Sequence, residues 1–260
     1  MEIQLDISLL AVGGALAVRF GVLTATLPLL DLRSVPPLWR VALAICFSAI
    51  LTPAVMAGLP AGQVDLSWQG LVLEAARSLV IGAMLGFTVN LVFTAVKYAG
   101  SVAGMQIGFA IVNAFDPMTQ SQVSIISQLY YILAVLLFFV TGAHQILVQT
   151  MFQCCVVVPP FGGLDPAAGS WFLLKEFGTI FELGLRIAAP IVVVLLLVSA
   201  SMGVIVKTVP QINVLAVGFP VKIAVGLITF GLSLVFFRQI TVSLMGELPA
   251  KLNQVLIALS

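Results

Sequence analysis

The ionisable side chains of this sequence favour charge pairing over catalysis. Two acid and base pairs have helical spacing, Glu74 with Arg77 at i, i+3 and Glu182 with Arg186 at i, i+4. Side chains three or four residues apart meet on one face of a helix, so each pair can neutralise itself near the end of an apolar run. A proton or ion relay would instead need an acid near the middle of a span without a cation, and no acid clearly meets that condition.

Two cations lie near the middle of apolar runs without an acid at helical spacing. They are Arg19 and Lys222. A long basic side chain can reach the membrane surface along its own helix, or it can meet an acidic group of another subunit. We expect one of these two arrangements for each residue.

Histidine and cysteine are too few for a metal centre or a disulfide framework. His144 is the single histidine, which excludes a site with two His ligands within one chain and favours a hydrogen-bonded structural role. Three cysteines, Cys46, Cys154 and Cys155, all lie inside apolar runs. No P-loop, Rossmann, G-x-S-x-G or H-E-x-x-H pattern is present in the sequence. We therefore predict that the protein is not an enzyme and holds no metal and no cofactor.

The elements around these residues must be membrane helices, because the composition excludes a water-soluble globule. Of 260 residues, 61% are hydrophobic and 8% are charged, whereas soluble domains carry roughly 25% charged residues. The excess apolar surface must face lipid or other proteins. A net charge of +1 with scattered cations argues against nucleic-acid binding. Glu2 and Asp6 precede the first apolar run, so we expect no cleavable signal peptide.

Six apolar runs are each long enough to cross a hydrocarbon layer of about 30 Å. Their residues do not alternate as outer-membrane strands do, so we predict an all-α membrane protein of helical hairpins. Trp39, Trp68 and Trp171 each precede a run and suit the membrane interface. The runs are about 7–30, 41–57, 70–96, 124–157, 179–206 and 211–237.

Several features predict that these helices are broken or kinked. The run at 124–157 would measure about 50 Å as one helix, which exceeds the bilayer core. An uncharged polar stretch leads into it at 119–128 and suits burial between proteins or a wet lumen. Prolines inside the runs free backbone groups that need other partners. They are Pro53, Pro190, Pro210 and Pro220.

Glycines at four-residue spacing predict close helix contacts. Gly100, Gly104 and Gly108 share one helix face, and Gly82 and Gly86 repeat the spacing in the preceding run. Such a row lets another backbone approach closely. The sequence leaves open whether the approaching helix belongs to this chain or to another subunit.

The C-terminal segment 238–260 predicts an amphipathic helix that is interrupted at Pro249. It could lie on a membrane surface or dock on a partner, and the sequence does not decide between the two. The apolar face consists of Ile240, Leu244, Leu248, Leu252 and Leu256.

Together these motifs resemble the R-type subunit family of the flagellar export gate, FliR, and its counterpart SctT in virulence type III secretion systems. Five elements occur in the family's order over nearly the whole chain. They are Arg19, Gly21, Pro28, Pro36 and Arg40; IGAMLGF at 81–87; AGSVAGMQIGFAIVNAFDP at 99–117; Gly142 with His144; and VPQINVLAVGFPVK at 209–222. Gly-Phe-Pro at 218–220 is typical of the flagellar branch.

The resemblance implies a non-enzymatic core component of a helical, multi-subunit protein export channel. It implies assembly with FliP-type and FliQ-type subunits, with FlhB-type and FlhA-type components, lipid and exported unfolded proteins as further partners. Residues 1–130 would be similar to the P-type subunit and 131–260 would continue into a Q-type-like part. The location implied is the bacterial inner membrane at the flagellar basal body, with part of the assembly displaced toward the periplasm.

The resemblance also implies a pore-plugging loop at about 106–122. The Asp-Pro step within it independently predicts a helix stop, because proline restricts the preceding residue and lacks a donor. The plug residues would be Gln106, Phe109, Phe115, Asp116, Pro117 and Met118. Besides the five glycines above, assembly would involve Pro210, Gln211, Asn213, Gly218 and Pro220.

Two other functions remain open from the sequence. Pro190, Pro210 and Pro220 fit a small-solute secondary transporter with broken helices, although residues 1–130 and 131–260 show no convincing repeat. A purely structural assembly nucleus without contact to a pore is the other alternative. Crosslinking of 106–122 to a stalled substrate would separate that nucleus from a channel component.

Overall fold

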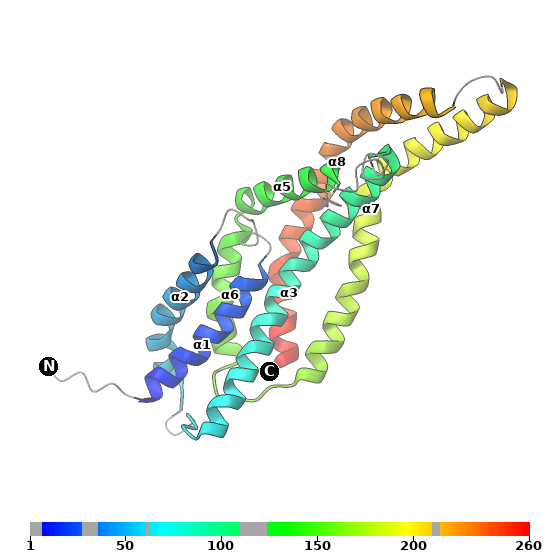
Figure 1. Cartoon of the computed structure of the whole chain (residues 1–260). Helices are drawn as coiled ribbons and strands as arrows, with labels where there is room; N and C mark the ends of the chain where they lie inside the picture. Colours follow the sequence, from blue (N-terminus) through cyan, green and yellow to red (C-terminus); the bar gives the residue numbers. More distant parts are fainter. Residues whose placement is uncertain (1–6, 28–35, 61–62, 110–123, 210–213) are drawn as a thin grey trace. The chain divides into compact units, whose positions relative to one another are not determined.

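The computed structural model describes residues 7–27, 36–60, 63–109, 124–209 and 214–260, and within these ranges the chain is all-α (Figure 1). No strand occurs in these ranges, which confirms the predicted fold class. The helices are α1 (Ile7–Thr26), α2 (Pro37–Gly58), α3 (Trp68–Ile107), α5 (Ile125–Val140), α6 (Ala143–Val157), α7 (Pro166–Thr208) and α8 (Val214–Leu259).

Five of these helices are long and apolar enough to cross a membrane, namely α1, α2, α3, α7 and α8. The pair α5 and α6 adds a sixth if the two helices form one span, in agreement with the six predicted runs. A break at Thr141 and Gly142 divides the long run at 124–157. Gly142 has φ +74°, a left-handed conformation that glycine adopts at little cost.

The chain forms two compact units that are interleaved in sequence. The first unit takes the described residues of 1–91, 142–177 and 246–260, and the second takes those of 92–141 and 178–245. The helices α3, α7 and α8 therefore contribute residues to both units.

In the first unit, α1 and α2 pack as a hairpin, and Ser48 Oγ donates a hydrogen bond of 2.6 Å to the Gly13 carbonyl. The C-terminal part of α8 also belongs to this unit. Its Lys251 forms an ion pair of 2.5 Å with Glu176 of α7, and the Asp165 amide donates to the Leu259 carbonyl at 3.1 Å. The C-terminal segment therefore docks on its own chain.

The predicted interruption at Pro249 is wrong, because α8 is continuous from Val214 to Leu259. A proline inside a helix removes one backbone hydrogen bond. Here the loss is offset by burial of the apolar face on both sides of it, since Leu244, Leu248, Leu252 and Leu256 are all buried. Pro53 and Pro190 likewise lie inside α2 and α7, which continue through them.

In the second unit, α5 packs by its aromatic residues against α3 and α8. The ring of Tyr130 stacks on Phe237 with centroids 4.5 Å apart, and its hydroxyl lies 3.4 Å from Ser233 Oγ. On the α3 side, Phe93 contacts Tyr131 and Phe138 with centroid distances of 6.1 and 5.7 Å. These contacts fix the α5 helix within the second unit.

Candidate functional site

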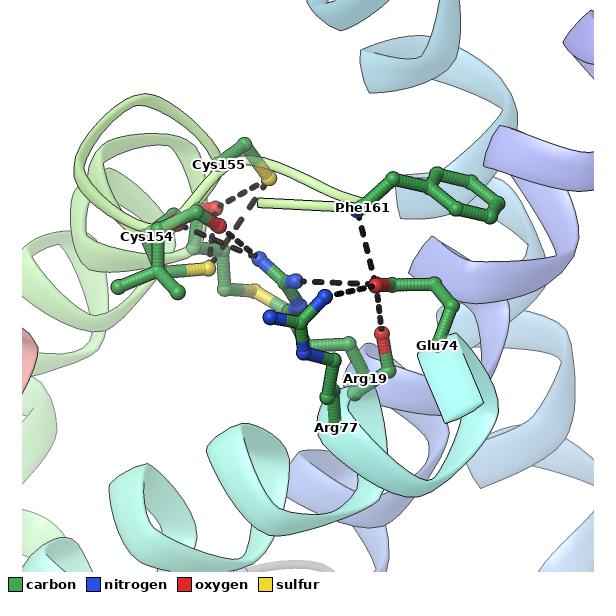
Figure 2. Close-up of polar contacts among 9 residues, drawn as sticks. Arg19, Glu74, Arg77, Cys154, Cys155 and Phe161 are labelled. Atoms are coloured by element: carbon green, nitrogen blue, oxygen red, sulfur yellow. Dashed lines mark hydrogen bonds and ion pairs between the residues drawn. The ribbon is translucent and has the colours of Figure 1, made fainter. Parts of the chain in front are cut away.

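A charge network lies buried inside the first unit, centred on Arg19 of α1 and Glu74 of α3 (Figure 2). Arg19 Nη2 is 3.6 Å from Glu74 Oε1, and the two side chains are 1% and 3% exposed. Desolvating an ion costs several kcal/mol, and the cost is offset only where the geometry supplies counter-charge and hydrogen bonds. The surroundings of both groups supply them.

The C-terminal end of α6 accepts hydrogen bonds from the arginine. Arg19 Nη1 donates to the carbonyl of Val158 at 2.8 Å and to that of Cys154 at 3.3 Å (Figure 2). The last carbonyls of a helix lack intrahelical donors and carry partial negative charge, so a cation is stabilised there. The guanidinium therefore joins α1 to α3 and to the end of α6.

The glutamate is held from the other side by donors of α3 and of the loop after α6. Ser78 Oγ donates to Glu74 Oε1 at 3.0 Å, and the Phe161 amide donates to Oε2 at 2.8 Å. Arg77 Nη1 lies 3.9 Å from the same Oε2. Phe161 has φ +59°, which is uncommon for a residue with a Cβ, and the carboxylate fixes its amide in place.

The prediction for Arg19 is wrong, because its acidic partner, Glu74, lies on another helix of the same chain. Neither snorkelling nor another subunit is needed, because α1 and α3 bring Arg19 and Glu74 together. The i, i+3 pair of Glu74 with Arg77 is present as well. Glu182 and Arg186 are exposed on α7, and no ion pair joins them in the described part of the chain.

Two glycines of α3 allow the approach of α1 that brings the charges together. A Cβ built at Gly82 would overlap the carbonyl oxygen of Arg19, and one at Gly86 would overlap Thr26 Oγ1. Any larger side chain would push the two helices apart. The spacing of these glycines thus sets the position of Arg19 relative to Glu74.

The other glycine row packs within the second unit. A Cβ at Gly100 would overlap the Cα of Ser127, and one at Gly104 would overlap Ser124 Oγ. Ser127 Oγ also donates to the Lys97 carbonyl at 2.8 Å. At Gly100 and Gly104, therefore, the start of α5 in this chain is the approaching helix.

Gly108 ends α3 rather than packing like its neighbours. Its φ is +102°, and its amide and that of Phe109 donate to the Gly104 carbonyl at 3.3 and 3.2 Å. A residue with positive φ after the last helical turn satisfies the exposed carbonyls and turns the chain away.

The remaining predicted residues fall into two groups. Gln106 and Phe109 are half-buried at the end of α3, Gly218 is buried on α8, and Pro220 is exposed. The others lie outside the described residues, and they are Phe115, Asp116, Pro117, Met118, Pro210, Gln211 and Asn213.

The network suits holding helices together. Its acid and its bases are paired, and the described residues include no group of three or more His, Cys, Asp and Glu placed to hold a metal ion. Sequence reasoning identified Glu74 with Arg77 but missed the Arg19 contact and the Phe161 amide. The Arg19 contact could have been suspected from the sequence, because one apolar run contains a single arginine and another contains a single glutamate.

Comparison with known sequences gives a consistent assignment. The family model described as "Bacterial export proteins, family 1" matches residues 10–248, a range that holds the whole network. The flagellar biosynthetic protein FliR of Bacillus subtilis (strain 168) is 33% identical over 219 residues, 81% of each chain. FliR of Escherichia coli (strain K12) is 30% identical over 206 residues, 79% of this chain and 77% of that protein. FliR of Pectobacterium carotovorum is 27% identical over 243 residues, 94% and 92% of the two chains.

Proposed function

This chain belongs to family 1 of the bacterial export proteins, and we propose that it is a non-enzymatic core component of the flagellar protein export channel. It resides in the bacterial inner membrane at the flagellar basal body. It assembles there with FliP-type and FliQ-type subunits, and helps to form and close a pore for unfolded export substrates.

The observation that carries this proposal is the exposed apolar surface of the longest helices. At 1.5 Å per residue, the 43 residues of α7 and the 46 of α8 have contour lengths of about 65 and 70 Å, twice a hydrocarbon core of about 30 Å. In the most apolar stretch of 18 residues in each helix, the rest of this chain buries only 17% of the residues. Apolar surface outside the hydrocarbon needs protein to cover it. Helical partner subunits supply that cover.

The buried network supports a framework role in the first unit. Arg19 and Glu74 link α1, α3 and the end of α6 through contacts of 2.8 to 3.6 Å. In the second unit, α3 is held against α5 at Gly100 and Gly104. The helix that leads into the segment 106–122 is therefore fixed in both units.

We assign pore closure to that segment, 106–122. Its residues combine aromatic rings, a flexible methionine and neutral polar groups, which can seal a lumen without binding a passing chain permanently. The side chains assigned to the plug are Gln106, Phe109, Phe115, Asp116, Pro117 and Met118.

Contact with the partner subunits is assigned to the segment around the start of α8. Its residues are Pro210, Gln211, Asn213, Gly218 and Pro220. In this scheme residues 1–130 play the P-type part and residues 131–260 continue into the Q-type part. Part of the assembly lies displaced toward the periplasm, where apolar surface is covered by neighbouring subunits.

Ion conductance of the assembled complex tests the plug. Replacing residues 110–118 by a Gly-Ser linker of equal length keeps the ends of α3 and α5 joined, and we expect conductance across a planar bilayer to rise. Replacing 61–64 in the same way is the control. Unchanged conductance in the first variant would remove the plug assignment.

Mass measurement of the intact particle tests the assembly. The chain is purified in mild detergent after expression with its FliP-type and FliQ-type partners, and the mass gives partners and copy number together. Recovery of this chain alone, folded and monomeric, would contradict the proposed assembly.

A further inference from the structure

A groove in the second unit has a composition that the channel function does not explain. It has a volume of about 210 Å³ and runs between α5 and α8. All but one of its lining side chains are hydrocarbon. They are Leu133, Leu136, Leu137 and Val140 of α5, and Leu234, Phe237 and Arg238 of α8.

Arg238 is an exposed cation at this apolar groove. It makes no hydrogen bond or ion pair with any residue that the structure describes. A guanidinium offers five donors in a planar fork, and that fork matches a phosphate group. The arginine therefore has its full binding capacity available at the edge of the groove.

Arg238 ends an uncharged stretch of α8 whose length suits a membrane crossing. Residues 223–237 carry no charge, and the sixteen steps from Lys222 to Arg238 (238 − 222) cover about 24 Å of helix. With both side chains extended outward, this segment matches a hydrocarbon core of about 30 Å. A crossing by this segment would put the groove just inside the headgroup layer. In the second unit, α5 ends at Val140, which lines the groove together with Arg238.

We propose that this groove binds an anionic phospholipid. One acyl chain lies along the leucines of α5 and α8, and the phosphate pairs with the Arg238 guanidinium. A phospholipid presents an anion and a hydrocarbon chain at the depth where this groove presents a cation and a hydrocarbon wall. Basic residues near the membrane surface also attract anionic lipid. The site goes beyond pore formation and does not depend on it.

The groove is continuous with surface of the kind that lipid covers. Leu136 and Val140, at its edge on α5, are 55% and 81% exposed. A protein partner would need a carboxylate positioned opposite Arg238 as well as an apolar face, whereas one lipid molecule supplies both. We therefore assign the site to lipid, and a protein occupant becomes a distinct outcome of the test.

Photocrosslinking in the complete complex tests the proposal. The complex is reconstituted in phosphatidylcholine vesicles with a trace of photoreactive-acyl phosphatidylglycerol or, in parallel, photoreactive-acyl phosphatidylcholine. We expect crosslinks within 133–140 and 234–238, about fivefold more abundant with the anionic lipid. Arg238→Gln should reduce them to the level of phosphatidylcholine. Arg186→Gln, at an exposed arginine of α7 in the same unit, is the matched control and should change nothing.

A second variant tests the acyl chain separately from the charge. Leu234→Trp fills the groove and keeps Arg238, so the crosslinks should fall although the charge remains. Equal crosslinking by both lipids, or no effect of Arg238→Gln, would overturn the proposal. Absence of crosslinks at the groove would show that protein covers it and would overturn the proposal as well. Unchanged particle mass and melting temperature show that each variant still assembles.

Discussion

Nη2 of Arg19 lies 3.6 Å from Oε1 of Glu74, and this contact connects α1 with α3 inside the first unit. The guanidinium also donates to two carbonyls of the α6 end, and the carboxylate accepts from the loop that follows α6. Both side chains are almost completely buried. Removing either one therefore leaves an uncompensated charge inside the protein.

Arg19→Met should destabilise the protein by about 3 to 5 kcal/mol, because Glu74 then keeps its charge in a buried site without its main counter-ion. The melting temperature in mild detergent measures the loss. Replacing Glu74 by Met in the same chain should restore part of the stability, since no buried charge then lacks a partner. A double variant as unstable as the sum of the two single variants would contradict this coupling.

Arg77→Gln provides the control for that measurement. Arg77 is 3.9 Å from Glu74 Oε2 and is 22% exposed, so solvent weakens its contribution. We expect a loss below about 1 kcal/mol. If Arg77→Gln and Arg19→Met lowered the melting temperature equally, the assignment of Arg19 as the main counter-ion would be wrong.

Gly82→Ala should separate α1 from α3. The added Cβ overlaps a backbone oxygen, that of Arg19, which cannot rotate away as a side chain does. Overpacking of this kind costs about 1 to 3 kcal/mol and should lower the melting temperature. Gly14→Ala on α1 is the control, because nothing lies within 4 Å of its built Cβ. A loss no larger than that of Gly14→Ala would show that the helices can move apart without cost.

The fold was predictable from the sequence to the extent that it depends on local pattern. The apolar runs predicted which segments form membrane-spanning helices and how many there are, because a helix needs about 20 apolar residues to cross the bilayer. The effect of Pro249 was not predictable, since its missing hydrogen bond competes with burial of Leu248 and Leu252, which depends on tertiary contacts. Local propensity is weak where packing opposes it.

The candidate site was predictable only where its partners share a helix. Glu74 and Arg77 are visible by their i, i+3 spacing. Arg19 is on another helix, and its distance from Glu74 depends on how α1 crosses α3, which no single-sequence spacing encodes. The spacing of Gly82 and Gly86 indicated a close helix contact, but it does not identify which helix makes that contact.

A cysteine pair tests that the glycine row of α3 packs within one chain. A Cβ built at Gly104 lies 3.0 Å from the Cβ of Ser124, near the separation of about 3.5 to 4.5 Å found in disulfides. In a chain whose exposed Cys46 is replaced by serine, oxidation of Gly104→Cys with Ser124→Cys should give a monomeric band and a linked peptide by mass spectrometry. Met105→Cys with Ser124→Cys is the control, because Met105 is exposed on another face of α3. A dimeric band from the first pair would indicate a contact between subunits.

The turn before α3 should contribute a small pH dependence. The Ser67 amide donates to Asp65 Oδ1 at 2.9 Å, and this hydrogen bond lowers the pKa of the Asp65 carboxyl below its ordinary value of 3.8. The folded chain thus favours the charged form, so this stabilisation is present above the ordinary pKa and is lost as the pH falls through the lowered one. Asp65→Asn should make the melting temperature change less between pH 6 and pH 3. An identical change in both proteins would contradict a role for this carboxyl.

Gly108→Ala should disturb the transition from α3 into the segment 106–122. Gly108 has φ +102°, and a residue with a Cβ reaches left-handed conformations at a cost of about 1 to 2 kcal/mol. The chain would then leave α3 in another direction, and under the proposed plug the conductance of the assembled complex should rise. Gly178→Ala, with nothing within 4 Å of its built Cβ, should leave conductance unchanged. If Gly108→Ala lowered stability by this amount but left the complex closed, the end of α3 would not set the position of the plug.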